Sequence, residues 1–320
     1  MFEGSQRALG RLISAVENGA PDAGAVLAAI EPHLGGALVI GITGAPGVGK
    51  SSLVSALVSE CRRREWTVGV VAVDPSSPVS GGAILGDRLR MAAHISDTGV
   101  FVRSVSARGH LGGLSATTSD IVDLMDAAGH NIVIVETVGA GQSEVEIAEL
   151  ADCRIVVSAP GLGDHVQAIK AGILEIADVL VVNKADLPGA DRTQDQLRAM
   201  LRLRTGSGAT VKVMQTCATD GRGLSELANL LETLKTPARE SVRTFAAQNR
   251  LRRVLARAVR DHAYQLALTA PQVATDALWH DVRAGRSSLE DAACRLLREL
   301  TNARITTRPD AEQEYDHETH

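Results

Sequence analysis

The sequence predicts an α/β fold built around a mostly parallel sheet. Apolar, β-branched runs recur between residues 37 and 215, and they alternate with segments whose apolar residues fall at helical spacing. A Gly-rich turn joins the first of these runs to the first helical segment behind it, as expected where a buried strand feeds a crossover helix. With 320 residues, 45% of them hydrophobic, the chain can bury one large core and carry a smaller appendage.

Strands are expected where short apolar runs are rich in Val and Ile, and helices where apolar residues recur every three or four positions. The predicted strands span residues 37–42, 67–74, 99–105, 131–136, 154–158, 179–182 and 210–215. The predicted helices span residues 5–19, 21–32, 52–58, 115–128, 167–176, 194–204, 224–235, 251–266, 272–284 and 289–300. Most predicted strands are followed by a helix, which is the order of a parallel sheet with crossover connections.

Changes in composition and the position of Pro237 divide the chain into four segments. Residues 1–36 form an N-terminal helical extension, and residues 37–236 form the α/β domain, which ends at Pro237. Residues 237–303 form helices, and we interpret them as a dimerisation or docking unit because three helices of this size suit that role better than a separate enzyme. Residues 304–320 form an acidic tail that we expect to be disordered.

Charge and cysteine content exclude several classes of protein. The net charge of -5 argues against nucleic acid or an anionic membrane as the main partner. None of the four cysteines stands in a C-x-x-C pair, so neither a zinc site nor a disulfide framework is indicated. The sequence has no apolar run of membrane-spanning length and no pattern of a secretory leader, so we expect a cytoplasmic protein with no membrane partner.

A phosphate-binding loop is predicted between the first strand and its helix. The loop reads GAPGVGKS, with glycines that let backbone N–H groups wrap an anion at a helix N-terminus. We expect Lys50 to reach β- and γ-phosphate oxygens and the Ser51 hydroxyl to bind Mg²⁺. The alternative, a Gly-rich turn without a ligand, is disfavoured because every fixed position of the motif agrees. The predicted contacts are Gly44, Ala45, Pro46, Gly47, Val48, Gly49, Lys50, Ser51 and Ser52.

Two other predicted strands end in an acidic residue. A right-handed crossover would place Asp74 beside the first strand, facing the phosphates, whereas the alternative is an aspartate that only opens the following turn. Glu136 is followed by residues 137–142, TVGAGQ, which resemble the D-x-x-G element of GTPases with Glu in place of Asp. A carboxylate there can hold Mg²⁺ through water, and the Gly139 N–H can sense the γ-phosphate.

The strand at residues 179–182 ends in a pattern that favours guanine. Asn183, Lys184 and Asp186 form N-K-x-D, in which an ionised Asp186 accepts from both N1–H and N2–H₂ of guanine. Adenine offers neither donor, so GTP is predicted over ATP. Cys217 and Ala218 follow the last strand, where GTPases place a backbone loop against guanine; for the Cys217 side chain itself, a small buried thiol is preferred to a redox role.

Taken together, six motifs in this order closely resemble the MeaB/ArgK family, the G-protein chaperones of adenosylcobalamin-dependent acyl-CoA mutases. The resemblance covers residues 5–235 well and the C-terminal helices more loosely. It rests on residues 44–51, on 73–78 (VDPSSP), on 108–113 (RGHLGG), on 136–144 (ETVGAGQSE), on 163–172 (GDHVQAIKAG) and on 183–186 (NKAD).

The resemblance implies a SIMIBI-class P-loop GTPase that binds GTP or GDP with Mg²⁺. Such proteins are usually homodimers joined through C-terminal helices; they gate cofactor loading of the mutase and protect it, and the cobalamin belongs to the mutase. The implied metal and water-positioning set is Ser51, Asp74, Asp87 and Glu136; the implied guanine-selecting pair is Asn183 and Asp186; Asp164 and Lys170 fall in a third switch loop.

Hydrolysis requires an oriented water and charge stabilisation on the γ-phosphate. Lys50 supplies charge, Asp74 is the first candidate for orienting the water, and Gln142 is the second. Two alternatives stay open: a nickel-insertion metallochaperone GTPase, and an ArgK-type nucleotide-dependent kinase or transport ATPase. The nine histidines form no metal-binding tract, and Asp186 argues against ATP. The sequence does not identify which acyl-CoA mutase is the client.

Overall fold

The computed structural model divides the chain into two compact units, residues 1–249 and 250–320. It describes residues 5–74, 92–94, 96–106, 116–137, 147, 150–161, 176–202 and 211–235 of the first unit, and 255–256, 259, 263–264, 266–268, 270 and 272–306 of the second. Several predicted segments fall wholly or largely outside these ranges: the motif at 108–113, residues 138–142, the helices at 167–176 and 251–266, and the acidic tail from residue 307.

The first unit is built on a parallel sheet, as predicted. Within the described residues the sheet has seven strands in the order β3-β2-β4-β1-β5-β6-β7, and every pairing is parallel. All of its carboxyl ends therefore lie along one edge. The strands are β1 (Leu38–Gly44), β2 (Val68–Asp74), β3 (Val100–Ser106), β4 (Ile132–Thr137), β5 (Cys153–Ser158), β6 (Val179–Val182) and β7 (Lys212–Gln215).

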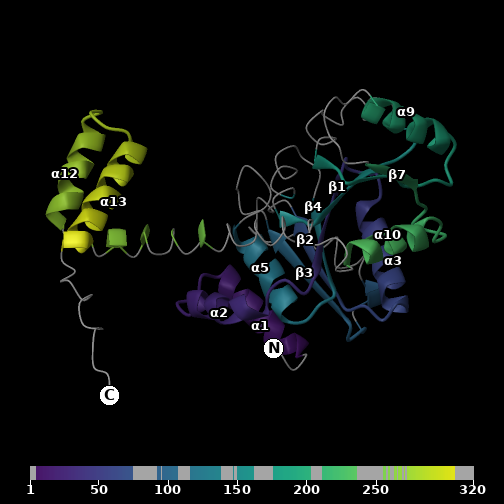
Figure 1. Ribbon diagram of the computed structural model, residues 1–320, viewed down its shortest axis with the longest axis horizontal. Coiled ribbons are helices and arrows are strands. Elements are labelled where there is room, and N and C mark those ends of the chain that lie inside the picture. The colour runs from purple at the N-terminus through teal and green to yellow at the C-terminus, as the bar shows by residue number, and fades with distance from the viewer. Residues whose placement is uncertain are drawn as a thin grey trace, which may run out of the picture. The chain divides into compact units, whose positions relative to one another are not determined.

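Helices cover both faces of the sheet (Figure 1), because the strands are apolar on both sides. One face packs on α3 (Lys50–Arg63) and α10 (Leu224–Lys235) through a cluster centred on β1, β4 and β5. The other face packs on α1 (Gln6–Glu17), α2 (Ala23–Ile30) and α5 (Ala116–Ala127), while α9 (Ala190–Arg202) covers β5 and β6. Two short 3-10 helices, η1 (Glu31–His33) and η2 (Ala92–His94), complete the described elements of the first unit.

The N-terminal helical extension forms as the spacing predicts. Ser5 caps α1 by accepting a hydrogen bond from the Ala8 N–H at 3.3 Å. Leu9, Ile13 and Val16 are the buried residues of this helix, and they pack in the hydrophobic cluster on this face of the sheet. The extension also contacts the start of β3, the edge strand on this side, because Gln6 Nε2 donates to the Thr98 and Val100 carbonyls, each at 3.0 Å.

Three helices extend beyond their predicted bounds, and the one expected at residues 52–58 spans Lys50–Arg63. The helix expected at residues 194–204 begins earlier, at Ala190, because the Pro188-Gly189 turn opens it: Gly189 has φ 93° and its carbonyl accepts from the Thr193 N–H at 3.0 Å. The helix expected at residues 289–300 continues through Thr306. No helix in the described ranges is long and apolar enough to cross a membrane.

The second unit holds a helical hairpin of α12 (Gln272–Arg283) and α13 (Leu289–Thr306). Leu278 and Ala292 are buried between the helices. Asp281 accepts from Arg286 at 2.9 Å and from Arg295 at 3.2 Å, so one carboxylate ties the turn and the second helix to the first. The hydrogen bonds from both guanidinium groups lower the pKa of Asp281.

Candidate nucleotide-binding site

The predicted phosphate loop leaves the sheet at the end of β1, between β4 and β5. Its glycines take backbone conformations that side chains disfavour: φ is 80° at Gly47 and 89° at Gly49. A Cβ at Gly44 would collide with the Val157 carbonyl oxygen, and one at Gly49 would lie 2.7 Å from Asn183 Nδ2. The loop can therefore approach its neighbours this closely only because these positions are glycine.

Lys50 opens α3 and folds back over the loop. Its side chain is buried, and Nζ donates to the Gly44 carbonyl at 2.9 Å and to the Ala45 carbonyl at 3.1 Å. The ammonium group is thus fixed above the loop, at the N-terminus of a helix whose dipole favours anions. This arrangement can bind a phosphate group.

Ser51, at the start of α3, contacts Glu136, near the end of β4. The Ser51 hydroxyl donates to Glu136 Oε1 at 2.7 Å, and both residues are buried, with 7% and 5% of their surface exposed. Sheet register explains the contact, because Glu136 pairs with Ile42 on β1, just before the loop. A hydroxyl and a carboxylate are oxygen donors of the kind Mg²⁺ prefers, so these two residues fit the predicted metal.

The other predicted members of the metal and catalytic set are not described. The Asp74 backbone ends β2, which lies next to β4 and not beside β1 as predicted, because β4 is inserted between the two strands; the Asp74 side chain falls outside the described residues. Asp87, Gly139, Gln142, Asp164 and Lys170 also lie outside them. In the ranges that the structure describes, no three His, Cys, Asp or Glu side chains gather as a metal cluster.

Asn183 connects the phosphate loop to the predicted guanine-reading loops. It follows β6, is 1% exposed, and donates from Nδ2 to the Val48 carbonyl at 3.0 Å and the Gly49 carbonyl at 3.3 Å. Its own Oδ1 accepts from the Thr216 hydroxyl at 3.2 Å. One buried amide therefore joins the loops that follow β1, β6 and β7.

Lys184 lies over the phosphate loop from the outside. Its backbone is left-handed, with φ 57°, and its Nζ donates to the Gly47 carbonyl at 2.8 Å. Directly behind it, the Ala185 N–H donates to the Thr216 carbonyl at 3.0 Å. These bonds hold residues 183–186 between the phosphate loop and the loop after β7.

Asp186 and Cys217 form a contact that the sequence did not predict. Asp186 is exposed, whereas Cys217 is buried and donates from Sγ to Asp186 Oδ1 at 3.2 Å. In the same loop, hydrogen bonds from Arg222 lower the pKa of Asp220 to about 2. Through its hydrogen bond to Oδ1, the Cys217 thiol contacts the carboxylate that is predicted to read guanine.

A groove of about 550 Å³ runs along α3, from Ser52 to Arg63, beside the loop after β7. Ser52 and Ala218, two predicted nucleotide contacts, both line it. On α3, Ser55 contacts His94 of η2, whose Nε2 lies 3.1 Å from the Ser55 hydroxyl oxygen and 3.0 Å from its carbonyl oxygen. Sequence reasoning missed His94. It placed Thr216 at the start of the loop expected to contact guanine but did not predict its hydrogen bond to Asn183.

Comparisons with known proteins agree with this geometry. Residues 9–272 match the family described as methylmalonyl Co-A mutase-associated GTPase MeaB. A Pyrococcus horikoshii protein is 46% identical over 77% of this chain and 83% of its own length. GTPase ArgK of Escherichia coli is 44% identical over 58% of this chain and 57% of its own length.

A mouse protein, the mitochondrial methylmalonic aciduria type A homolog, is 36% identical over 59% of this chain and 46% of its own length. A crystal structure titled LAO/AO transport system kinase superposes with a TM-score of 0.66 at 26% identity, over 96% of this chain and 95% of that one. The phosphate loop, the parallel sheet and these similarities lead to one conclusion. The chain belongs to the MeaB/ArgK family of P-loop GTPases.

Proposed function

We propose that the protein is a Mg²⁺-dependent GTPase that acts as a chaperone of an adenosylcobalamin-dependent acyl-CoA mutase. The observation that carries the nucleotide part is the buried Asn183 amide, which ties the phosphate loop to the N-K-x-D loop. The family match and the name of the mouse relative support the mutase part. In this role the protein gates loading of the cobalamin, which belongs to the mutase, and protects the mutase from inactivation.

Each half of the site has a proposed task. Lys50 and the N–H groups of the loop bind the phosphates and stabilise the charge that develops on the γ-phosphate. Asn183 and Asp186 select guanine, and the Lys184 stem covers the base. Ser51 and Glu136, with Asp74 and Asp87, hold Mg²⁺, which supplies charge neutralisation at the phosphates. Asp74 or Gln142 orients the attacking water.

A homodimer through the second unit is part of the proposal. Large apolar side chains that are exposed among the described residues lie almost entirely in that unit, as expected of a helical surface that packs on a partner copy. They are Leu255, Val259, Tyr264, Leu268, Trp279, Leu289 and Leu297. We also propose a cytoplasmic location, which the four free cysteines support.

The test is steady-state GTP hydrolysis by the full chain, alone and with a purified adenosylcobalamin-dependent acyl-CoA mutase. The proposal expects slow, GTP-selective and Mg²⁺-dependent turnover that rises when the client mutase is added. ATP and the Lys50→Ala variant are the controls. If ATP is preferred, the proposed role of Asp186 is wrong; if no candidate mutase binds or changes the rate, the chaperone role is wrong while the GTPase role stands.

A further inference from the structure

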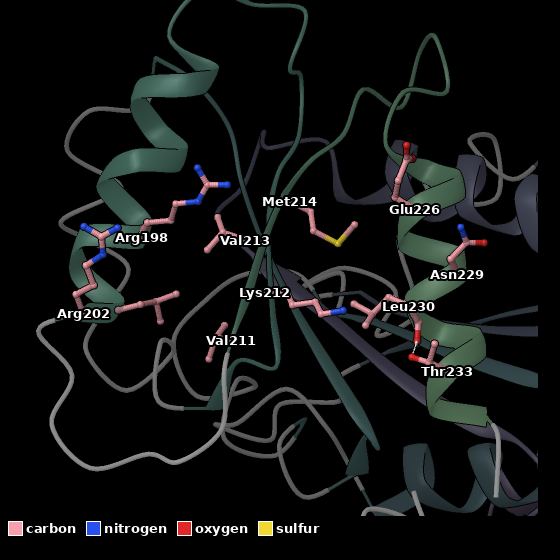
Figure 2. A pocket seen from close by; sticks show the side chains of 11 residues that line it. Arg198, Arg202, Val211, Lys212, Val213, Met214, Glu226, Asn229, Leu230 and Thr233 are labelled. Atoms are coloured by element: carbon pink, nitrogen blue, oxygen red, sulfur yellow. Dashed lines mark hydrogen bonds between the residues drawn. The ribbon is translucent and has the colours of Figure 1, made fainter. Parts of the chain in front are cut away.

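The β7 edge of the sheet carries a groove away from the nucleotide site (Figure 2). The groove measures about 710 Å³ and lies between α9 and α10, with β7 along its floor. Within the described residues β7 pairs with β6 alone, so it is an edge strand on this side. None of the residues that line the groove belongs to the predicted nucleotide set.

The backbone of β7 presents hydrogen-bonding groups to this groove. The N–H groups of Lys212 and Thr216 point to β6, donating to the Asp178 carbonyl at 3.4 Å and the Val182 carbonyl at 2.9 Å. Alternate residues of a strand point to opposite sides, so Val213 directs its N–H and C=O away from β6. The Gln194 side chain donates to that Val213 carbonyl at 3.2 Å, a bond that an added strand can replace.

The two walls of the groove differ in chemistry. The α9 wall carries Arg198 and Arg202, which Figure 2 shows on the same helix. The α10 wall is mixed. It presents Leu230 beside Met214 of β7, and both pack on the core beneath the groove, but Glu226, Asn229 and Thr233 of α10 also line it, and Figure 2 shows Lys212 directed to this side. An extended chain laid along β7 would therefore meet two arginines on its α9 side, and on its α10 side the apolar pair of Met214 and Leu230 with Lys212 and polar residues around it.

Charge in the groove is strongly unbalanced. Arg198, Arg202 and Lys212 line it, against Glu226 as the one acidic lining residue. Arg198 makes only a long, exposed contact with Asp195 at 3.5 Å, and neither Arg202 nor Lys212 has an ion pair with any residue that the structure describes. Three cations in one groove of a chain with a net charge of -5 form a local site for an anionic partner.

We propose that the β7 edge binds an extended acidic segment of a partner protein by strand addition. The segment alternates acidic residues, which face Arg198 and Arg202, with apolar residues, which face Met214 and Leu230. Main-chain hydrogen bonds to Val213 provide affinity, and the two unlike walls select the alternation. This docking surface is independent of the proposed nucleotide chemistry.

The test uses two fluorescein-labelled peptides of one composition with the full-length protein. One peptide alternates Glu and Val over six residues, and the other groups three Glu before three Val. Fluorescence anisotropy should give at least about tenfold tighter binding of the alternating peptide, with an affinity that falls as salt is raised. Equal affinity of the two peptides, or binding of neither, would overturn the proposal.

Two further comparisons separate charge from strand pairing. The Arg198→Glu, Arg202→Glu double variant should weaken binding about tenfold or more, whereas Arg192→Glu, an exposed change on α9 outside the groove, should not. N-methylation of the alternate peptide amides that face β7 should abolish binding, because it removes the hydrogen bonds to the strand. N-methylation of the amides that face away from β7 should leave binding unchanged. If both methylated peptides bind alike, or if light scattering shows that the double variant only breaks self-association, strand addition of a partner segment is wrong.

Discussion

The candidate site has two halves: a phosphate half of Lys50, Ser51 and Glu136, and a guanine half made of Asp186 and the loop after β7. The two are held in different ways. Lys50, Ser51 and Glu136 are buried and fixed by backbone carbonyls and by a neighbouring strand. Asp186 is exposed, and its described support is one thiol from the next loop. The difference implies that substitutions on the phosphate half remove rate or stability, while those on the guanine half shift affinity and selectivity and leave the fold intact.

Removing the Lys50 ammonium should have the largest effect. In the Lys50→Ala variant we expect kcat for GTP to fall at least about a hundredfold, because one preorganised group at the developing charge is worth about 10²–10³ in rate. Phosphate release measures the loss. Lys184→Ala is the matched control, since its ammonium contacts the same loop from the exposed side and should raise KM more than it lowers kcat. Equal losses in kcat would erase the distinction between the two halves.

Changing the carboxylate that is predicted to read guanine should alter selectivity. Asp186→Asn presents an amide N–H₂ to the donors of guanine, so we expect affinity for GDP to fall at least about a hundredfold. Xanthine carries a carbonyl at position 2, so the variant should bind xanthosine diphosphate better than GDP. Competition against a fluorescent nucleotide measures both constants, and the unfolding midpoint should stay near that of the parent protein because Asp186 is exposed. A variant that keeps its preference for GDP would mean that another residue reads the base.

Gly49 tests the connection between the halves. In Gly49→Ala we expect the free energy of unfolding to fall by about 1–3 kcal/mol from left-handed strain, and by more where the new Cβ presses on Asn183. Gly129→Ala is the matched control, because Gly129 has nearly the same φ, 87°, with open space around it. Urea unfolding of both variants isolates the Asn183 contribution. Equal losses would show that Asn183 moves aside without cost and does not couple the two halves.

Much of the fold could be predicted from the sequence, because strand identity and helix periodicity depend on local residue patterns. The order of the strands was predicted only in part. The right-handed crossover was expected to set β2 beside β1, but β4 lies between them, and no local sequence pattern indicates that insertion. The start of α9 was misplaced because Pro188 and Gly189 indicate a turn and also open a helix.

The same distinction, between local residue patterns and the packing of distant segments, applies to the candidate site. Motifs with fixed spacing predicted Lys50, Ser51 and Asn183, and the structure brings these residues within one connected set of loops. The contacts made by His94, Thr216 and the Cys217 thiol have no motif, because they depend on how separate loops pack at the sheet edge. Those contacts could be found only from the structure.

The Cys217 thiol provides the smallest and most specific test of this comparison. Cys217→Ala removes the donor to Asp186 Oδ1, so we expect the Kd for GDP to rise by about threefold to tenfold, the range for one hydrogen bond worth about 0.5–1.5 kcal/mol. Cys217→Ser keeps a donor and should recover most of the affinity. Isothermal titration of the three proteins measures the series. If the Cys217→Ser variant binds GDP as weakly as the Cys217→Ala variant does, the sulfur acts through packing under the loop. The guanine half would then be held by burial, as the phosphate half is.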